Sequence, residues 1–518
     1  MNARAIVPIL LYVVAAALAP VANAGSSLVE ARPAARAFLT LTGAREIAPS
    51  ISMWEVPSSV VPQLRHAGLL RLAQPVRRLH LRDTPPPITD PFFPQEWWLP
   101  DIGWDKVTPP GPGVPIAIVD TGLDMTHPEF ASRPDVQLLN TQDVSAASDF
   151  HGTAVSSVAA APENGVGIVG VYPQAVLREY DADLSGDLTD ASLIAGIDAA
   201  ARAGPSVINL SVGTTTYDQA LQDEIYAANR LGSLVVAAAG NSRDQGNPLT
   251  FPANMSHVLT VGATDTNDEP AFFSNSSPAV DLAAPGTSIY AAVPTKYIAD
   301  GYSEVDGTSF AAPIVAAAAA WVWTVRSDLD NTQLFELMRT SARDVPPPGF
   351  DNLTGFGIVN IPNALTQTAP SRDPQEPNDD IDQVKPGGLF PTGRPPLTSR
   401  GTPTSALHAR LDFTEDPEDV YRIWVPGLRT VAVSVHATKP IALELWRPST
   451  RSVTETGAAK RRDLAAAAER FAASQRLTVT NRDKLGAYYY ADVFIQTSNA
   501  AYDLKIASPT AIKKTAKP

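Results

Sequence analysis

The sequence predicts an α/β protein in which a doubly wound, mostly parallel sheet carries helices on both faces. A small N-terminal α+β unit precedes this domain, and a C-terminal antiparallel β-sandwich follows it. Three observations predict this arrangement. Short apolar stretches alternate with helical patterns between residues 95 and 365, as in a buried parallel sheet. Stretches rich in proline interrupt the chain at 83–94 and 366–404. The chain of 518 residues is also longer than one domain usually is.

The composition excludes several classes of protein. The formal net charge is −14, with acidic and basic residues interspersed, which argues against a nucleic-acid-binding surface. The chain has no cysteine, so it forms no disulfide and no thiolate metal site. Only 18% of residues are charged, which is unlike a disordered chain.

The first 24 residues have the pattern of a secretory signal peptide. Arg4 supplies the positive charge, Ile6–Ala19 the apolar run, and Ala22-Asn23-Ala24 a small-x-small cleavage pattern. The alternative is a membrane anchor, but the run is shorter than the roughly 20 residues that span a bilayer. We therefore expect cleavage after Ala24, a secreted protein and no stable membrane anchor.

Residues 25–82 predict a small α+β unit, and residues 83–94 an exposed linker. The unit contains short alternating and apolar pieces with a helix candidate between them: Phe38–Leu41, Ile51–Val56, Leu69–Leu81 and the helix Val60–Ala67.

Residues 95–365 predict the parallel sheet, whose carboxyl ends are the usual place for a ligand. The expected strands are Val114–Val119, Val207–Leu210, Leu234–Ala238, Val258–Val261 and Val280–Ala283. The expected helices are Gly152–Ala161, Leu188–Ala203, Tyr217–Arg230 and Ser309–Arg326.

After the linker at 366–404, residues 405–508 predict the antiparallel β domain, and residues 509–518 a flexible tail. The expected strands are Val420–Val425, Thr430–Val435, Ile441–Trp446, Tyr488–Ile495 and Tyr502–Ile506. An alanine-rich stretch, Ala458–Ser474, is expected to be helical.

The stretch Gly307–Pro313 places Ser309 at the start of an apolar helix. The free N–H groups and partial positive charge of a helix N-terminus suit a nucleophile whose attack creates an oxyanion. The alternative is an ordinary helix cap. Pro313 lacks the N–H group that would bond the Ser309 carbonyl in a regular helix.

Three further residues are candidates to act with Ser309. Asp120 ends an apolar strand, His151 begins a helix, and Asn241 ends another strand beside Gly240. A carboxylate can orient a histidine base, and an amide N–H can bind an oxyanion. Each also has a structural alternative: a loop aspartate, a structural histidine and an asparagine turn.

Together these residues resemble the subtilisin family of serine proteases over about residues 95–365. The order Asp, His, Ser is that of subtilisins. Three blocks match family signatures: Asp120-Thr121-Gly122, His151-Gly152-Thr153 and Gly307–Pro313. The resemblance implies a subtilisin-like fold in which Ser309 attacks, His151 is the base, Asp120 orients it and Asn241 donates to the oxyanion. Ser309 is not in the Gly-x-Ser-x-Gly elbow of lipases and esterases.

The resemblance also implies where a peptide binds. Asn209–Gly213 matches the family's edge segment, which pairs with an extended peptide as an added strand. The P1 pocket would lie between two walls and close near Thr250; the walls are Ser211, Val212 and Gly213 on one side and Ala239 and Gly240 on the other. Small, uncharged walls predict apolar or large P1 side chains.

The resemblance implies no cofactor for the chemistry but a structural calcium ion. The segment Ala161–Ile168 resembles a family calcium loop, in which Asn164 would be a ligand. Glu129 occupies the position of the family's aspartate ligand, and Gln95 would supply a side-chain oxygen. The alternative is a plain Asn-Gly turn.

The flanking regions resemble known companions of such enzymes. Residues 25–82 lie where the family carries a propeptide that inhibits, assists folding and is removed autocatalytically. The C-terminal domain resembles the pre-peptidase C-terminal β domain at three places: Glu376–Asp379, Asp416–Val425 and Ala501–Leu504.

These observations lead to the hypothesis of a secreted serine endopeptidase, made as a self-processed zymogen, that acts as a monomer on polypeptides. Two alternatives stay open: a binding or adhesion protein that works through the β domain, and a processing protease with narrow specificity.

Overall fold

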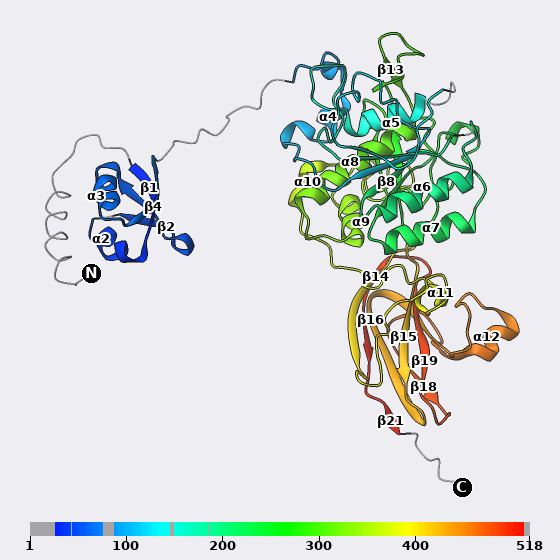
Figure 1. The fold of residues 1–518 in the computed structure, drawn as a ribbon. Coiled ribbons are helices and arrows are strands. Elements are labelled where there is room, and N and C mark those ends of the chain that lie inside the picture. The colour runs from blue at the N-terminus through cyan, green and yellow to red at the C-terminus, as the bar shows by residue number, and fades with distance from the viewer. Residues whose placement is uncertain (1–25, 43, 76–87, 146–149, 185, 512–518) are drawn as a thin grey trace, which may run out of the picture. The chain divides into compact units, whose positions relative to one another are not determined.

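A computed structural model describes residues 26–42, 44–75, 88–145, 150–184 and 186–511. The chain forms two compact units, Met1–Pro87 and Ile88–Pro518, which are described separately (Figure 1). The predicted signal peptide, residues 83–87 of the expected linker and residues 512–518 of the expected tail lie outside the described residues.

The N-terminal unit is α+β, as predicted. Its antiparallel sheet has the strand order β2-β3-β1-β4, and Val29, Trp54 and Leu64 are buried in its core. The elements are β1 (Ser26–Ala31), α2 (Arg36–Leu41), β2 (Arg45–Ala48), β3 (Met53–Pro57), α3 (Val61–His66) and β4 (Leu70–Pro75). The apolar piece Phe38–Leu41 belongs to helix α2, because Phe38 and Leu39 face the core while Leu41 is exposed.

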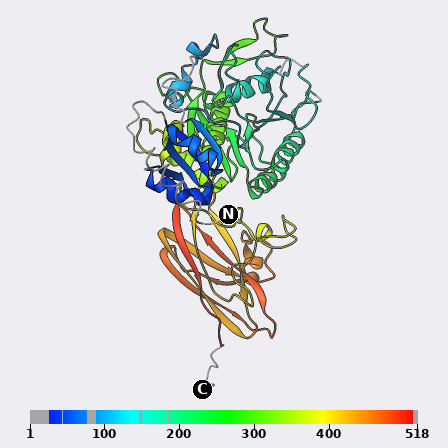
Figure 2. The ribbon, with the colours of Figure 1, turned by 60° about the vertical axis from the view of Figure 1, so that its left-hand side comes forward.

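The second unit contains a seven-stranded sheet in which every pairing is parallel, as predicted (Figures 1 and 2). The strand order is β11-β10-β9-β8-β5-β7-β6. The strands are β5 (Ile116–Asp120), β6 (Val136–Leu138), β7 (Leu177–Asp181), β8 (Val207–Leu210), β9 (Leu234–Ala238), β10 (Val258–Thr264) and β11 (Leu282–Pro285).

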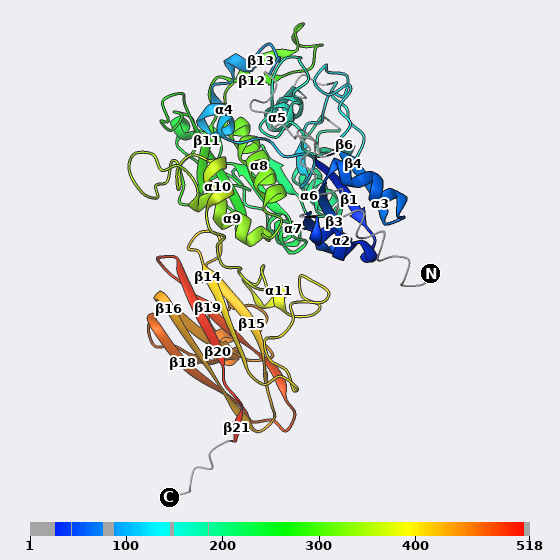
Figure 3. The same cartoon turned by 90° about the vertical axis from the view of Figure 1, so that its left-hand side faces the viewer.

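Helices cover both faces of this sheet (Figure 3). Alternate residues of each strand point to opposite faces: Ile116 and Ile118 pack with α8, whereas Ala117 and Val119 pack with α6. The first face carries α5 (Phe150–Ala160), α8 (Thr308–Val325) and α9 (Asn331–Thr340), and the second carries α6 (Asp190–Arg202) and α7 (Gln219–Arg230). Helix α8 is long and apolar enough to cross a membrane, but 83% of that window is buried, as expected of a core helix.

Strand β7 was not predicted from the sequence because its residues look polar. Arg178 donates to the Gln137 side chain and to the Gly204 carbonyl, and Glu179 accepts from Ser156. These buried polar side chains are satisfied by partners far away in the sequence, so the strand does not need an apolar pattern.

The strand order reverses at β5, which lies between β7 and β8. Strands later in the chain than β7 extend the sheet on the other side of β5. Such a switch point leaves a crevice at the carboxyl ends of the strands, where ligands bind in doubly wound sheets. Asp120 is the last residue of β5 and therefore lies at that crevice.

The C-terminal region consists of antiparallel sheets, as predicted, that share one long strand (Figure 2). The first half of β16 (Arg429–Trp446) pairs with β18 and β20, and its second half pairs with β17 and β19. The other strands are β14 (Ser405–Leu411), β15 (Glu418–Val425), β17 (Leu464–Ala467), β18 (Ala472–Asn481), β19 (Ala487–Phe494), β20 (Ala500–Ile506) and β21 (Thr510–Ala511).

The helix expected over Ala458–Ser474 is wrong for most of its length. Only α12 (Gly457–Asp463) is helical; β17, a short connection at 468–471 and the start of β18 follow it. Pairing with β16 supplies these residues with backbone hydrogen bonds, so tertiary context overrides the helix propensity of alanine.

The segments expected as a linker and a tail also carry structure. Helix α11 (Ile381–Val384) lies within 366–404, and the Asn378 carbonyl accepts from the Val420 N–H group of β15 at 2.7 Å. Strand β21, inside the expected tail, pairs with the start of β16. Both segments are therefore joined to the β domain.

Candidate active site

Asp120 and His151 meet at the switch point of the sheet. The Asp120 carboxylate is buried and accepts from the Thr121 N–H group at 2.8 Å. The same oxygen, Oδ1, lies 2.8 Å from Nδ1 of His151, at the start of α5. Gly152 allows this approach, because a Cβ atom there would lie 2.4 Å from the Gly122 carbonyl oxygen.

The Asp120 contact sets the protonation behaviour of His151. Burial by itself lowers the pKa of an imidazole, since it disfavours the charged form. The charge of Asp120 and its hydrogen bond outweigh burial, so the pKa of His151 is raised above its ordinary value. The hydrogen bond at Nδ1 also leaves Nε2 as the nitrogen available to a reacting group.

Ser309 lies in the first turn of α8, beside His151. The ring of the next residue, Phe310, is 5.7 Å from the His151 ring, centroid to centroid. The Ser309 hydroxyl donates to the Ser211 carbonyl at 3.2 Å, and the Ser211 hydroxyl donates to the Ser309 carbonyl at 2.8 Å. Because Pro313 cannot supply the helical N–H group to that carbonyl, Ser211 replaces it.

Asn241 is held in one orientation by Thr308. The Asn241 Oδ1 atom accepts from both the N–H group and the hydroxyl of Thr308, each at 2.8 Å. The Thr308 hydroxyl also accepts from the Gly240 N–H group at 3.1 Å. With Oδ1 engaged, Nδ2 is the donor that no described residue occupies, and it lies on the Gly307 side next to the start of α8. Sequence reasoning did not assign this role to Thr308; a hydroxyl residue directly before the serine was the available signal.

The predicted substrate-binding walls are joined through Thr250. Its hydroxyl donates to the Ala239 carbonyl at 2.5 Å, and its Cβ lies 4.0 Å from the place of a Cβ on Gly213. Gly240 has φ +105°, and a Cβ there would lie 2.7 Å from the Asn275 amide nitrogen. Glycine at 240 therefore serves the turn and keeps the space beside Thr250 open.

A cleft of about 610 Å³ begins at Val212 and Gly213 and extends toward the starts of α6 and α7. Its apolar lining includes residues that the sequence did not single out: Leu188, Leu193, Tyr217 and Phe251. Leu188 and Tyr217 are exposed, so both are accessible at the cleft. Their positions in loops before helices gave no pattern that would have identified them.

The expected calcium loop contains buried carboxylates from separate segments. Glu129 accepts from the Ile168 N–H group and the Tyr302 hydroxyl, both at 2.9 Å, and from the Asn164 side chain at 3.4 Å. Asp90 accepts from the N–H groups of Asn164 and of the next residue at 3.1 Å. Gln95 is exposed, and Asp90 is the arm residue that reaches the loop.

Burial raises the pKa of Glu129 to about 7 and holds the pKa of Glu96 well above its usual range, with Asp90 adding like charge to both. Oxygen donors and surplus negative charge fit a calcium ion. The Asn164 oxygen, however, accepts from the Val166 N–H group at 2.8 Å in this structure.

Comparison with known proteins identifies relatives of the central domain. A family model described as the subtilase family matches residues 111–357. Subtilisin Savinase of Lederbergia lenta is 34% identical over 251 residues, which are 48% of this chain and 90% of that protein. Subtilisin DY of Bacillus licheniformis is 32% identical over 51% of this chain and 96% of that protein. A solved protease structure from Pseudoalteromonas arctica is 24% identical, covers 54% of this chain and 98% of that chain, and has a TM-score of 0.45.

Proposed function

Because this chain belongs to the subtilase family of serine proteases, we propose that it is a secreted endopeptidase that cleaves polypeptides through an acyl-enzyme. The observation that carries the proposal is the 2.8 Å contact between Asp120 and His151. The His151 ring also lies 5.7 Å from the ring of Phe310, the residue after Ser309 in the first turn of α8. Acyl-enzyme chemistry needs a carboxylate, an imidazole base and a nucleophilic hydroxyl. Asp120, His151 and Ser309 supply these three groups in that order.

The reaction begins when the Ser309 hydroxyl turns from the Ser211 carbonyl toward Nε2 of His151. His151 takes the hydroxyl proton as Ser309 attacks the scissile carbonyl. Asp120 stabilises the imidazolium and keeps its tautomer, without taking the proton itself. His151 then gives the proton to the leaving amine, and a water molecule hydrolyses the acyl-enzyme by the same base.

The oxyanion is bound by Asn241 Nδ2 and by the Ser309 N–H group at the helix start. The clamp on Asn241 Oδ1 supports this role, because the donor needs no reorientation during the reaction. In this family the loss of one such donor costs about 3–4 kcal/mol of the barrier.

The peptide adds a strand along Ser211, Val212 and Gly213, and its P1 side chain lies between these residues and Ala239 and Gly240. Thr250 closes that pocket. Main-chain pairing tolerates many peptide sequences, so broad specificity is expected. The small, uncharged pocket walls favour apolar or large P1 residues. The apolar cleft beyond Val212 receives a side chain further toward the peptide N-terminus.

The N-terminal unit acts as an intramolecular inhibitor and folding aid, and a signal peptide precedes it. The apolar run of residues 6–19 supports export. Asp90, Glu129 and Asn164, together with loop carbonyls, would hold a calcium ion that stabilises the loop and supplies no chemistry.

The Ser309→Ala variant tests the proposal. It is expected to lose peptide hydrolysis and to keep its N-terminal unit, as read by intact mass and N-terminal sequencing beside the wild type. Full activity in this variant would refute the mechanism. Failure of folded wild type to react with an active-serine phosphonate would instead favour binding or adhesion through the β domain. Cleavage of one library peptide only, with casein intact, would favour a processing protease.

A further inference from the structure

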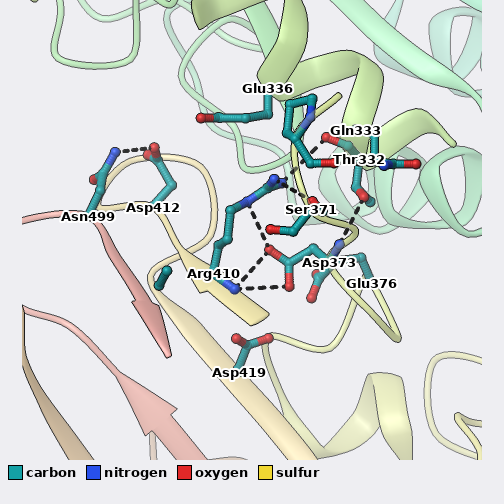
Figure 4. A network of polar contacts seen from close by, with 12 residues as sticks. Thr332, Gln333, Glu336, Ser371, Asp373, Glu376, Arg410, Asp412, Asp419 and Asn499 are labelled. Atoms are coloured by element: carbon teal, nitrogen blue, oxygen red, sulfur yellow. Dashed lines mark hydrogen bonds and ion pairs between the residues drawn. The ribbon is translucent and has the colours of Figure 1, made fainter. Parts of the chain in front are cut away.

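One end of the β domain is held by the protease domain. Arg410, near the end of β14, donates to the Ser371 carbonyl at 2.8 Å and to the Thr332 carbonyl of α9 at 3.5 Å, in the network that Figure 4 shows. Asp412, directly after β14, bonds Arg339 of α9 at 2.8 Å. The end of the β domain at which β14 finishes is therefore occupied.

The opposite end of the β domain is formed by loops between its strands. Strand β14 begins there at Ser405, opposite the last residue of β20. Val425, the last residue of β15, lies opposite Ala487 at the start of β19. The Trp424 N–H group donates to the Thr398 hydroxyl at 2.7 Å, which joins the two places. We call these loops the distal loops; they comprise residues 398–404, 426–429 and 481–486.

Two leucines of the distal loops are exposed to solvent. Leu485 is 80% exposed, more than any other large apolar side chain among the described residues, and Leu428 is 51% exposed. The Leu428 N–H group donates to the Asp483 carbonyl at 3.0 Å, so the two loops that carry the leucines are joined. Single exposed leucines are normal on a protein surface, whereas neighbouring ones on joined loops indicate an interaction site.

The backbone around Leu428 is not explained by the stability of the loop. Its φ is +56°, in the left-handed region that favours glycine and penalises a residue with a Cβ atom. Gly427 allows the close approach of the two loops, because a Cβ there would overlap the Lys484 carbonyl oxygen. A glycine at 428 would fit this turn better, so the leucine serves another purpose.

Basic side chains surround the leucines, although the formal net charge of the chain is −14. The distal loops contain one acidic residue, Asp483, and four exposed basic residues: Arg400, Arg429, Arg482 and Lys484. Three further lysines follow Ala511 in the sequence, and Ala511 pairs with Arg429. The distal loops therefore carry a local positive charge that attracts an anionic surface.

Two aromatic rings lie directly behind the leucines. Trp424 and Tyr488 are opposite each other on β15 and β19, with ring centroids 5.0 Å apart, and both are half-buried. Gly486, next to Leu485, packs against the Trp424 ring, where a Cβ would overlap it. Tryptophan and tyrosine favour the boundary between lipid headgroups and acyl chains. Leucines outermost and aromatic rings behind them therefore match the order of layers that a bilayer presents.

We propose that the distal loops dock the β domain on a lipid bilayer with anionic headgroups. Leu428 and Leu485 enter the boundary between headgroups and acyl chains, and the four basic side chains contact the headgroups. A soluble polyanion would use the basic residues but not the leucines. An apolar peptide would use the leucines but not the charge, whereas an anionic bilayer uses both.

Docking through the distal loops leaves the protease domain outside the bilayer, because that domain contacts the other end of the β domain. The proposed peptidase would then be held near proteins displayed on the same surface. Two leucines give a reversible contact and not a stable anchor. Docking does not depend on peptidase activity, so an inactive variant can be used to measure it.

The experiment uses the full chain with Ser309→Ala, which prevents self-digestion and leaves the distal loops unchanged. The protein is floated with vesicles of phosphatidylcholine alone, or of phosphatidylcholine and phosphatidylglycerol in equal amounts. We expect it to float with the vesicles that contain phosphatidylglycerol and not with the others. High salt should release it, because salt screens exposed charges.

Leu428→Gly with Leu485→Ser tests the apolar contribution. Loss of both side chains is expected to lower the vesicle partition coefficient about tenfold. This variant should melt no lower than its parent, because glycine suits the left-handed backbone at 428, so weaker binding would not come from misfolding. The matched control is Leu231→Ser, which removes a leucine that is 48% exposed in the protease domain; it should bind as the parent does.

Arg482→Gln with Lys484→Gln tests the charge. Each basic side chain beside an anionic bilayer contributes about fivefold to the partition coefficient, so the pair should lose about 25-fold. Arg451→Gln with Arg470→Gln removes the same charge from two exposed positions elsewhere in the β domain. This control should bind nearly as well as the parent.

Three results would overturn the proposal. The first is equal flotation with both kinds of vesicle, or with neither. The second is unchanged binding of the leucine variant while the Arg482 and Lys484 variant loses it, which would favour a soluble polyanion. The third is a dimer of the parent that the leucine variant dissociates in analytical ultracentrifugation, which would assign the leucines to a second copy of the chain.

Discussion

At the scale of single residues, Thr308 fixes the orientation of the Asn241 amide, the proposed oxyanion donor. Two groups of Thr308, its N–H and its hydroxyl, bond the same amide oxygen. The side chain is fully buried, so water cannot take over the hydroxyl's role.

Thr308→Val keeps the shape of this residue and removes its hydroxyl. The variant loses one of the two bonds that hold Asn241, at a cost of about 1–1.5 kcal/mol, and also the bond from the Gly240 N–H group. We expect kcat to fall about tenfold with KM nearly unchanged, measured on a chromogenic peptide. Thr340→Val, which loses a bond within α9 and one from the Gln367 side chain, both exposed, is the control. A change in KM alone would mean that Thr308 shapes the pocket instead.

His151 sets the pH dependence of the reaction. A general base must be neutral, and Asp120 raises the pKa of His151 above the ordinary value of about 6.5. Activity is therefore expected to rise with pH, with a midpoint in kcat/KM above about 6.5. A midpoint at or below that value would contradict the dominance of Asp120 over burial. The measurement is kcat/KM against pH at constant ionic strength.

At the scale of elements, the first turn of α8 depends on the edge segment that lies beside it. Pro313 leaves the Ser309 carbonyl without its helical partner, and the Ser211 hydroxyl takes that place. The helix start and the substrate-binding edge are thus joined by one side chain.

Ser211→Ala in the Ser309→Ala background tests this replacement. It leaves a carbonyl unsatisfied and should lower the free energy of unfolding by about 1–2 kcal/mol. Adding Pro313→Ala restores a helical N–H group, so the double variant should recover part of the loss. Chemical denaturation gives the free energies of unfolding of the parent, the two single variants and the double variant. These values give the coupling energy between positions 211 and 313, and strict additivity of the two changes would refute the replacement.

The same scale shows what the sequence could and could not predict. Strands β8 and β9 were predicted residue for residue, because they are continuous apolar runs bounded by turns. Strand β7 was missed because Arg178 and Glu179 are satisfied only by distant partners, and strand β17 was taken for helix because its alanines pair with β16. The triad candidates were recognisable because each follows a strand or begins a helix within a local motif. The bonds between Thr308 and Asn241 and between Asp90 and the Asn164 loop join segments that are far apart in the sequence. No local sequence pattern could predict them.

At the scale of the whole molecule, the protease sheet and the β domain meet through buried charge. Arg339 of α9 bonds Asp281 at 3.1 Å and Asp412 at 2.8 Å. Glu415 is also buried, close to the like charges of Asp281 and Asp412. The Arg339 ion pairs could not be foreseen, because Arg339 lies 58 positions from Asp281 and 73 positions from Asp412 in the sequence.

The stability of this junction should fall as the pH rises, which is the opposite of ordinary acid unfolding. Burial holds the pKa values of Glu376, Glu415, Asp416 and Asp419 well above their usual range. Their protonated forms are therefore favoured in the folded state. The protonated carboxyl groups therefore stabilise the folded state fully below the unfolded pKa of about 4. This stabilisation is lost as the pH rises toward their pKa values in the folded state.

In chelator, the melting temperature of the Ser309→Ala protein should accordingly fall between about pH 5 and pH 8. Glu376→Gln should reduce the fall, whereas Glu444→Gln should not. Scanning calorimetry at several pH values checks this, and a flat or rising melting temperature would contradict it.

The two hydrogen bonds exchanged between Ser211 and Ser309 also have a consequence for how the substrate preference of the enzyme could change. In the proposed mechanism Ser211 belongs both to the wall of the P1 pocket and to the support of Ser309, whose carbonyl it bonds. A substitution at this position that changed substrate preference would therefore also lower turnover. Val212, Leu188 and Tyr217 line the cleft without touching the triad. Directed evolution toward new peptides should accumulate substitutions at those three positions and leave Ser211 unchanged.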